Sequence, residues 1–260
     1  AAMGWYNYHY FGSPLTVGQS IMGELLAIDK TGAPDIWQTP LWYGAAAQLI
    51  SPSRGLLVYS PFLLFSAWGG FAAWRDPAYR PLRPLTVSVV LIACTQFKWF
   101  DYWGGWAYGY RPLVDLAPLL CLFLLPVLRR IWQNRELQAV FAAMLMWSFC
   151  VQVIGAFSYD KVGWNERMLH AVLLTGWERR MVLTREKALE LVEEKGGEYL
   201  GIHYCNMDYP FCRHRLWSVR DNQIGYYATH FWEARAKRLD PGWDQLLLPS
   251  SRLTALHDPW

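Results

Sequence analysis

Long apolar stretches constrain the fold of this chain more than any other feature. Four of them occur, and the third contains a single charged side chain, Asp115: residues 56–74, 84–97, 112–128 and 137–157. A helix needs about 20 mostly apolar residues to cross a bilayer. The stretches therefore predict an α-helical integral membrane protein with about four transmembrane helices. Buried helices of a soluble protein remain the alternative.

The composition is typical of a membrane part joined to a more polar part. Apolar residues make up 53% of the 260 residues and charged residues 17%, yet the mean hydropathy is only +0.06. We therefore expect membrane lipids as partners of the apolar part. The net charge of +3 is small and scattered, which argues against a nucleic-acid partner.

Six arginines indicate how the chain is oriented in a membrane. They follow the first and third apolar stretches: Arg75, Arg80, Arg83, Arg129, Arg130 and Arg135. Because cytoplasmic loops are enriched in Lys and Arg, we expect both of these loops on the cytoplasmic side. The N-terminal segment, the loop 98–111 and everything after residue 157 then face outward.

We predict three regions on this basis. Residues 1–55 form an outward aromatic and interfacial segment, with a turn-rich part at 7–14 and an interfacial helix at 37–50. Residues 56–157 form the transmembrane helical domain. Residues 158–260 form a small outward-facing α/β domain.

Charges become dense after residue 157, and short strand and helix patterns follow. We expect strands at 167–174, 181–183 and 199–204, a helix at 185–195 capped by Thr184, and a second helix at 221–237. No phosphate loop, dinucleotide fingerprint or Gly-x-Ser-x-Gly turn occurs in the sequence.

Cys205 and Cys212 lie in the expected outward domain, between His203 and His214. The order His-x-Cys-x6-Cys-x-His allows a metal site, because thiolates and imidazoles bind Zn²⁺. The short Cys-x2-4-Cys spacing of many zinc sites is absent, however, and an oxidising compartment favours a disulfide. A disulfide, two free thiols and a metal site therefore remain open at this point.

The segment between the second and third stretches carries the strongest signal for function. It contains Trp103, Gly104, Gly105 and Trp106, followed by Arg111 and Asp115. A charged side chain at the bilayer centre costs about 2.5–3.5 kcal/mol. This combination of glycines, aromatic rings and charges therefore predicts a place where the chain re-enters the membrane and recognises a polar group.

Several sequence strings resemble bacterial membrane glycosyltransferases of the GT-C class, which use polyprenyl-phosphate-linked sugars. The strings are YFGSP at 10–14, SPSRGLLVYSP at 51–61, WGGW at 103–106 with Tyr110, Arg111 and Asp115, and RLWSVRDNQI at 215–224. Their order is that of the C-terminal half of such an enzyme, over residues 5–160 and 213–237. The resemblance implies a polyprenyl-phosphate-linked sugar donor and a bacterial inner membrane location, with residues 158–260 on the periplasmic side.

The resemblance also implies roles for single residues. Arg111 would bind a phosphate, Trp103 and Trp106 would stack on a sugar or an isoprenoid, and Gly104 and Gly105 would admit the donor close to the backbone. Asp115 lies four residues after Arg111 and either holds that arginine or contacts substrate. Asp101 is a weak candidate for the base.

Two functions therefore remain open. GT-C enzymes carry the catalytic acidic residue in an outward loop near the N-terminus, and no position of this sequence matches that motif. The chain is either the C-terminal half of a transferase that moves a sugar to a cell-envelope acceptor, or a non-catalytic membrane subunit that stabilises a larger complex of membrane proteins. The first hypothesis expects an upstream catalytic half, and the second expects partner subunits.

Overall fold

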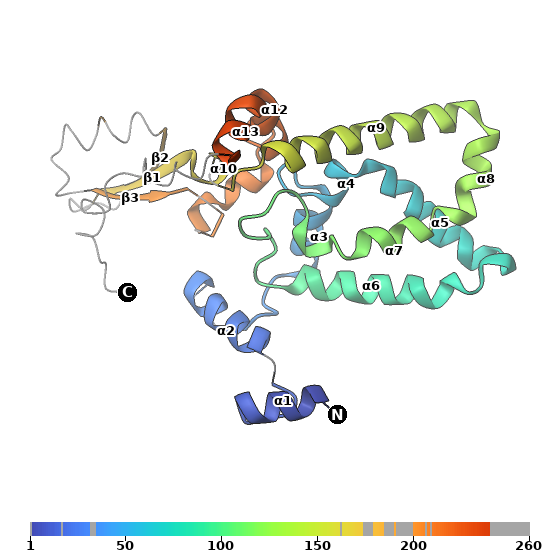
Figure 1. Ribbon diagram of the computed structural model, residues 1–260, viewed down its shortest axis with the longest axis horizontal. Coiled ribbons are helices and arrows are strands. Elements are labelled where there is room, and N and C mark those ends of the chain that lie inside the picture. Colours follow the sequence, from blue (N-terminus) through green and yellow to red (C-terminus); the bar gives the residue numbers. More distant parts are fainter. Residues whose placement is uncertain are drawn as a thin grey trace.

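The computed structural model shows a mostly helical protein (Figure 1). It describes residues 2–16, 18–31, 35–161, 163–173, 179–184, 190, 200–205, 207–208 and 210–239. The predominance of helix agrees with the expected fold class. A small antiparallel sheet lies at the end of the molecule opposite to α8.

Five helices form the main body of the molecule. They are α5 (Leu64–Arg75), α6 (Leu82–Lys98), α7 (Leu116–Leu122), α8 (Leu125–Gln133) and α9 (Arg135–Ser158). Helices α6, α7 and α9 follow the long axis of the molecule, and α8 connects α7 to α9 at one end (Figure 1). The side chain of Asn134 begins α9 by accepting hydrogen bonds from the amides of Glu136 and Leu137.

The helices differ from the four continuous segments expected from the sequence. The stretch 56–74 is divided into α4 (Leu56–Tyr59), the 3₁₀ turn η1 (Pro61–Leu63) and α5. Pro61 explains this break, because a proline disfavours helical backbone at the residue before it; Ser60 has φ −139° and ψ 63°. The stretch 112–128 is likewise divided, with a bend of 57° between α7 and α8.

Among the described residues, α9 is the one helix that is both long and apolar enough to cross a membrane. The bent pair of α7 and α8 makes a second if the two are counted as a single segment. Helix α6 has 17 residues. The helix lengths alone therefore do not establish four spans.

The N-terminal region is more helical than expected. Helix α1 (Ala2–Phe11) covers part of the segment 7–14 that was expected to be turn-rich, which makes that prediction wrong. Helix α2 (Gly18–Thr31) follows, and α3 (Leu41–Ile50) occupies most of the expected interfacial helix and packs on α6. In Figure 1, α1 stands away from the helical body, whereas Gly23 of α2 is buried beside the ring of Trp99, the residue after α6.

The C-terminal region contains the expected strands. After α10 (Gly163–Glu166), strands β1 (Met168–Leu173), β2 (Arg179–Thr184) and β3 (Leu200–Tyr204) form an antiparallel sheet in the order β2-β1-β3. The expected helix 185–195 lies outside the described residues apart from Glu190.

Three helical elements follow the sheet. They are η4 (Pro210–Trp217), α12 (Gln223–Thr229) and α13 (Phe231–Leu239), and the last two pack against α9. The prediction of a single helix at 221–237 is therefore wrong, because two helices occupy this range. His230, with φ −106° and ψ 24°, separates α12 from α13.

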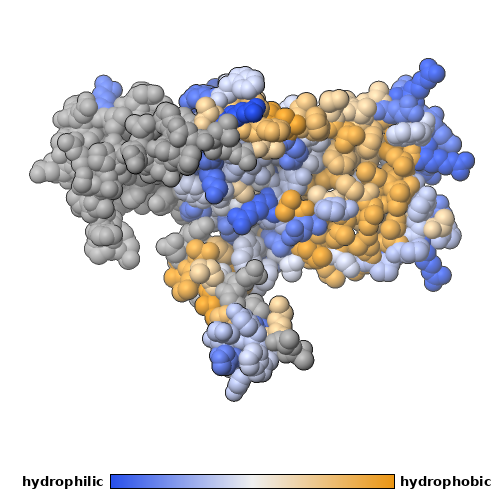
Figure 2. Space-filling model, in the orientation of Figure 1, coloured by the Kyte–Doolittle hydropathy of each residue, from blue (hydrophilic) through white to orange (hydrophobic). Residues whose placement is uncertain are grey.

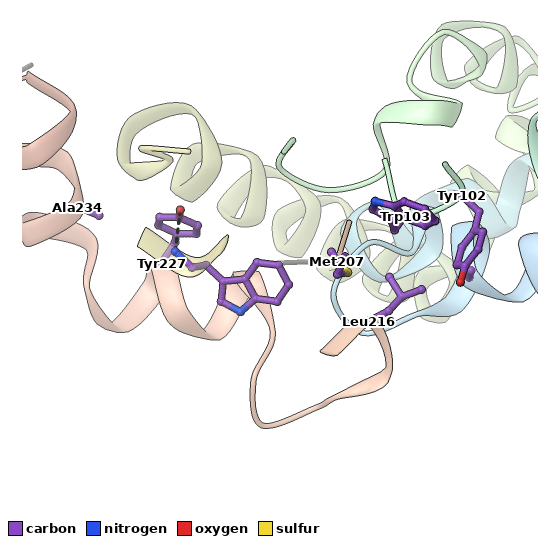
Figure 3. Close-up of a cluster of buried hydrophobic side chains, with 8 residues drawn as sticks. Tyr102, Trp103, Met207, Leu216, Tyr227 and Ala234 are labelled. Carbon is purple, nitrogen blue, oxygen red and sulfur yellow. Dashed lines mark hydrogen bonds between the residues drawn. The ribbon is translucent and has the colours of Figure 1, made fainter. Parts of the chain in front are cut away.

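Several apolar cores hold the described elements together, and two of them bear on the site. The first lies among α4 to α7 and includes Leu56, Phe97 and Phe123. The second joins the loop after α6 to the C-terminal region through Trp103, Trp164 and neighbouring aromatic side chains (Figure 3). The second core therefore fixes the loop that carries most of the predicted site residues.

The close packing of α5 depends on Gly69. A Cβ atom at Gly69 would lie 1.5 Å from the backbone oxygen of Phe123, whereas a Cβ at the next residue, Gly70, would meet only Thr86 Cγ2 at 3.9 Å. We expect Gly69→Ala to lower the free energy of unfolding by about 1–3 kcal/mol, because a backbone atom must move. Gly70→Ala should be neutral or should stabilise by up to about 1 kcal/mol. Equal melting temperatures of the two variants in detergent would contradict this packing.

Candidate functional site

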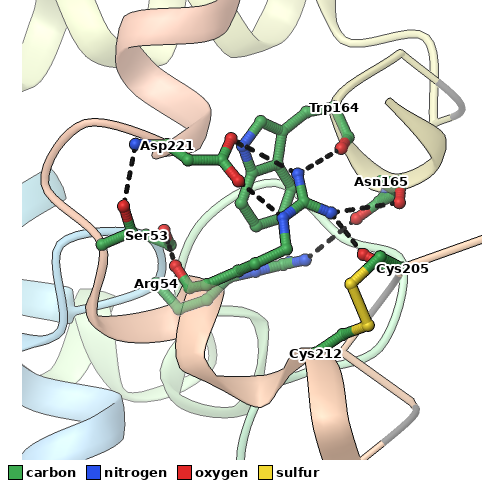
Figure 4. A network of polar contacts seen from close by, with 9 residues as sticks. Ser53, Arg54, Trp164, Asn165, Cys205, Cys212 and Asp221 are labelled. Carbon is green, nitrogen blue, oxygen red and sulfur yellow. Dashed lines mark hydrogen bonds and ion pairs between the residues drawn. A yellow bond between two sulfur atoms is a disulfide. The ribbon is translucent and has the colours of Figure 1, made fainter. Parts of the chain in front are cut away.

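Three segments that are distant in sequence meet at the end of the helical body opposite to α8. They are the turn 51–55 before α4, the loop 99–110 after α6, and the parts of the C-terminal region at 164–165 and 210–227. Their polar contacts surround the indole ring of Trp164, which is fully buried (Figure 4). We call Arg54, Trp164, Asn165, Arg215 and Asp221 the Trp164 network.

Arg215 connects three parts of the C-terminal region through one guanidinium group. Its Nε lies 2.7 Å from Asp221 Oδ2, and its terminal nitrogens donate to the carbonyl oxygens of Trp164 at 2.7 Å and Cys205 at 2.5 Å. The guanidinium carbon lies 4.1 Å from the centroid of the Trp164 ring. Because the side chain is 1% exposed, these contacts replace water as its hydrogen-bond partners.

Arg54, in the turn 51–55, holds the loop 99–110 in place. It donates to the carbonyl oxygens of Ala107 and, at 3.0 Å, Gly105. Its guanidinium also lies over the Trp164 ring, 5.6 Å from the centroid. Burial lowers the pKa of Arg54, and nearby acidic groups partly oppose that shift. A guanidinium group nevertheless stays charged near neutral pH.

Gln223 completes the attachment of the loop, and Tyr59 holds the turn 51–55. Gln223 Nε2 donates to the Ala107 carbonyl at 3.0 Å, and its Oε1 accepts from the Gly109 amide at 3.1 Å. The Tyr59 hydroxyl donates to the Ser53 carbonyl at 2.9 Å. Both polar ends of Gln223 thus hold the backbone of residues 107–109 in place.

Two buried tyrosines remain neutral beside this network. The Tyr227 hydroxyl donates to Asp160 Oδ1 at 2.7 Å and accepts from the Trp164 amide at 3.3 Å. Burial first, and then the Asp160 carboxylate, raises the pKa of Tyr227 far above its usual value. Burial likewise raises the pKa of Tyr108. Neither hydroxyl is therefore a base near neutral pH.

The two predicted stacking residues occupy different environments. Trp103 is 1% exposed and packs in the second core, and Arg213 lies 4.1 Å above its ring. In this structure the burial of the ring leaves no surface of Trp103 open to the sugar or isoprenoid on which it was predicted to stack. Trp106 is 37% exposed, and the two indole nitrogens donate to the two carboxylate oxygens of Asp208 at 3.1 and 3.0 Å.

Gly104 and Gly105 shape the turn between these tryptophans. Their φ angles are +76° and +58°, a region that favours glycine. The Gly105 amide donates to Asp101 Oδ1 at 3.2 Å, so the carboxylate of Asp101 stabilises this turn. The local backbone therefore accounts for both glycines and for Asp101 without a ligand.

Arg111 and Asp115 are both exposed. Among the described residues, neither side chain forms a hydrogen bond or an ion pair with the other. The expected pairing fails because Arg111 begins the 3₁₀ turn η3 (Arg111–Leu113), and α7 begins only at Leu116. The two residues thus do not share a regular α-helical turn.

An exposed apolar stripe leads away from Arg111, from the residue after η3 through α7 to the first residue of α8. Its members lie three or four residues apart and are exposed to solvent or lipid: Val114, Pro118, Cys121, Leu122 and Leu125. Val114 and Leu125 are 50% and 52% exposed. Arg111 therefore lies where the polar loop 99–110 meets an apolar surface.

Cys205 and Cys212 form a disulfide, with their Cα atoms 5.3 Å apart. This is one of the three arrangements that the sequence left open. The two sulfur atoms are consequently not thiolate ligands for the low-probability metal site with His203 and His214. No group of three or more metal-ligating side chains occurs within the described parts of the chain. The side chain of His203 lies outside them.

The residues that organise this region were not predicted from the sequence. Arg54, Trp164 and Asp221 had no predicted role, because each is an isolated residue whose partners are distant in the sequence. Comparisons with protein-family models, curated proteins and solved structures found no match to this chain. The likeness to GT-C enzymes therefore rests on the sequence strings alone.

Proposed function

We propose that this chain is the C-terminal half of a membrane glycosyltransferase of the GT-C class, and that Arg111 binds the phosphate of a polyprenyl-phosphate-linked sugar at the outward side of the membrane. The observation that carries the proposal is the position of Arg111. Its exposed guanidinium lies at the end of the apolar stripe on α7. A lipid phosphate needs a cation beside an apolar surface.

The apolar exterior of the helical body supports insertion into a membrane. Only 11% of the most apolar 18-residue window of α9 is buried, whereas a core helix of a soluble protein would be mostly buried. The 24 residues of α9 span about 36 Å, enough for a hydrocarbon core of about 30 Å. Figure 2 shows a continuous hydrophobic surface over the body between two more polar ends.

The exposed apolar side chains come from several helices, which supports four spanning segments despite the breaks within them. Side chains at least 45% exposed are found on α5, α6 and α9: Phe71, Trp74, Val87, Val90, Leu91, Val140, Leu145, Met146, Trp147, Phe149 and Phe157. An exposed apolar surface of this extent is typical of a membrane or protein contact. Lipid provides such a contact around the whole body.

The charge distribution supports the orientation. The six arginines lie at the end of α5, just before and at the start of α6, within α8 and at the start of α9, which places them at one end of the body. Figure 2 shows hydrophilic residues gathered at this end. The positive-inside rule then directs this end to the cytoplasm and Arg111 outward.

The local chemistry around Arg111 fits recognition of a lipid phosphate. A guanidinium presents a planar fork of donors to phosphate oxygens. The stripe from Val114 to Leu125 offers an apolar surface for the isoprenoid chain, and the exposed edge of Trp106 is available to a sugar. The catalytic acidic residue belongs to the upstream half in this proposal.

Binding of undecaprenyl phosphate to the purified full chain tests the proposal. We expect Arg111→Ala to weaken binding by about 10- to 150-fold, which corresponds to the loss of one charge-assisted contact of about 1.5–3 kcal/mol. Arg220→Ala is the matched control, because Arg220 is exposed in the C-terminal region away from the stripe. Unchanged affinity of Arg111→Ala at an unchanged melting temperature would remove this role.

The N-terminal helix favours a second function, that of a non-catalytic subunit in a larger membrane complex. Helix α1 stands apart from the body (Figure 1) and exposes 69% of Trp5 and more than half of Tyr6, Tyr8 and Tyr10. A partner subunit would cover such a surface. A photo-crosslinker at Trp5 that captures one stoichiometric partner chain, together with normal lipid binding by Arg111→Ala, would favour this function.

A further inference from the structure

A pocket of about 500 Å³ lies at the arginine-rich end of the body. It is formed by the end of α5, the 3₁₀ turn η2 (Pro77–Tyr79) and α8. Its lining combines three aromatic rings with three arginines: Trp68, Phe71, Tyr79, Arg75, Arg129 and Arg130. The volume falls within the range of about 300–1,000 Å³ that is usual for ligand pockets. We call it the arginine pocket.

The positive charges in the arginine pocket are not neutralised by the protein. Throughout the described ranges of the chain, the guanidinium groups of Arg75, Arg129 and Arg130 form no hydrogen bond or ion pair. Asp76, the acidic residue of the lining, instead begins η2 by accepting a hydrogen bond from the Ala78 amide at 2.9 Å. The pocket therefore presents three cations and one engaged carboxylate.

Aromatic rings of the pocket wall hold two of these cations in position. The Arg75 guanidinium lies 4.3 Å from the centroid of Phe71, and that of Arg130 lies 5.9 Å from the centroid of Trp68. Such cation–π contacts orient a guanidinium but occupy none of its N–H donors. The donors are therefore available to an anion.

The pocket continues into the apolar surface of the body. Phe71 and the adjacent Trp74 are 57% and 50% exposed, and Leu128, next to Arg129, is 39% exposed. A free phosphate ion would leave these apolar groups uncovered. A ligand that joins a phosphate to an acyl chain would satisfy both the cations and the apolar groups.

We propose that the arginine pocket binds the phosphate head group of an anionic phospholipid in the cytoplasmic leaflet. This inference rests on the membrane insertion in the proposed function but concerns the opposite end from Arg111. Basic pockets beside membrane helices on the cytoplasmic side are suited to anionic head groups.

Native mass spectrometry of the full chain in detergent tests the proposal. The probes are phosphatidylglycerol, phosphatidylcholine and inorganic phosphate, and the variants are Arg129→Gln and Arg75→Gln. Arg135→Gln is the matched control, because Arg135 is an exposed arginine at the same end outside the pocket lining. We expect each pocket variant to lose phosphatidylglycerol affinity by roughly tenfold, while the control changes little. Wild-type protein should retain phosphatidylglycerol in preference to phosphatidylcholine.

Three outcomes would overturn the proposal. Equal losses of phosphatidylglycerol affinity in Arg129→Gln and Arg135→Gln would show a general charge effect. Equal retention of phosphatidylglycerol and phosphatidylcholine would show that the pocket does not recognise the charge of the head group. Inorganic phosphate that binds as tightly as phosphatidylglycerol would make the pocket a free-phosphate site. Undecaprenyl phosphate binding should stay normal in Arg129→Gln. Failure of the arginine-pocket proposal therefore leaves the Arg111 proposal intact. If Arg111→Ala loses undecaprenyl phosphate binding but keeps phosphatidylglycerol binding, the arginine-pocket proposal is unaffected.

Discussion

Replacing Arg215 by alanine should destabilise the protein by about 3–5 kcal/mol, the usual penalty for breaking a buried ion pair. The substitution leaves the Asp221 carboxylate without its 2.7 Å partner, and it leaves the carbonyl oxygens of Trp164 and Cys205 without this donor. A loss of this size is a large fraction of the total stability of a typical domain. Thermal unfolding in detergent measures it.

The neighbouring Arg220 provides the control for this prediction. Arg220 is exposed, so Arg220→Ala should change stability by no more than about 0.5 kcal/mol. Arg215→Lys should be nearly as damaging as Arg215→Ala, because an ammonium group cannot serve the carboxylate and two carbonyl oxygens with the same planar geometry. A melting temperature of Arg215→Ala equal to that of Arg220→Ala would show that the Trp164 network does not hold the region together.

Replacing Trp164 by alanine should have an effect of the same order, about 3–5 kcal/mol. The ring is fully buried beneath two guanidinium groups, and its Nε1 donates to Asp221 Oδ1 at 3.0 Å. Removal of the indole ring opens a cavity and takes away the surface against which both guanidinium groups pack. The loop 99–110 should then become accessible, which hydrogen exchange of the Gly105 and Gly109 amides measures.

Trp232 is the matched control for Trp164. It lies in the same C-terminal region but is 75% exposed, so Trp232→Ala should leave exchange in the loop unchanged. The Trp164 and Arg215 substitutions should be non-additive in combination, because they remove parts of one network. Fully additive losses, or protection of the loop in Trp164→Ala, would contradict the proposed coupling.

The elements that follow local patterns were predictable from the sequence. The uncharged stretch 137–157 corresponds to α9, since its length and composition determine a helix without reference to distant residues. The strand patterns at 167–174 and 199–204 likewise correspond to β1 and β3. Pro61 also marks a helix break that the hydropathy of residues 56–74 concealed.

The candidate site was harder to predict, because its geometry depends on contacts between distant residues. Arg54 reaches Gly105 and Asn165, which lie 51 and 111 residues away in the sequence. The burial of Trp103 depends on the C-terminal region that covers it. A tryptophan-rich string alone does not show whether a ring lies in the core or at a binding surface. Of Trp103 and Trp106, only Trp106 is exposed.

Cysteine accessibility in spheroplasts tests the central claim most directly, namely that the protein spans the membrane with the Arg111 end outward and the arginine pocket inward. The free residues Cys94, Cys121 and Cys150 are first replaced by alanine, which leaves the disulfide in place. Single cysteines then replace Val219, which is 73% exposed, or Arg80, which is also exposed.

We expect a membrane-impermeant maleimide to label Val219→Cys in intact spheroplasts and to label Arg80→Cys only after the membrane is permeabilised. Equal labelling of both positions before permeabilisation, or the reverse pattern, would contradict the account.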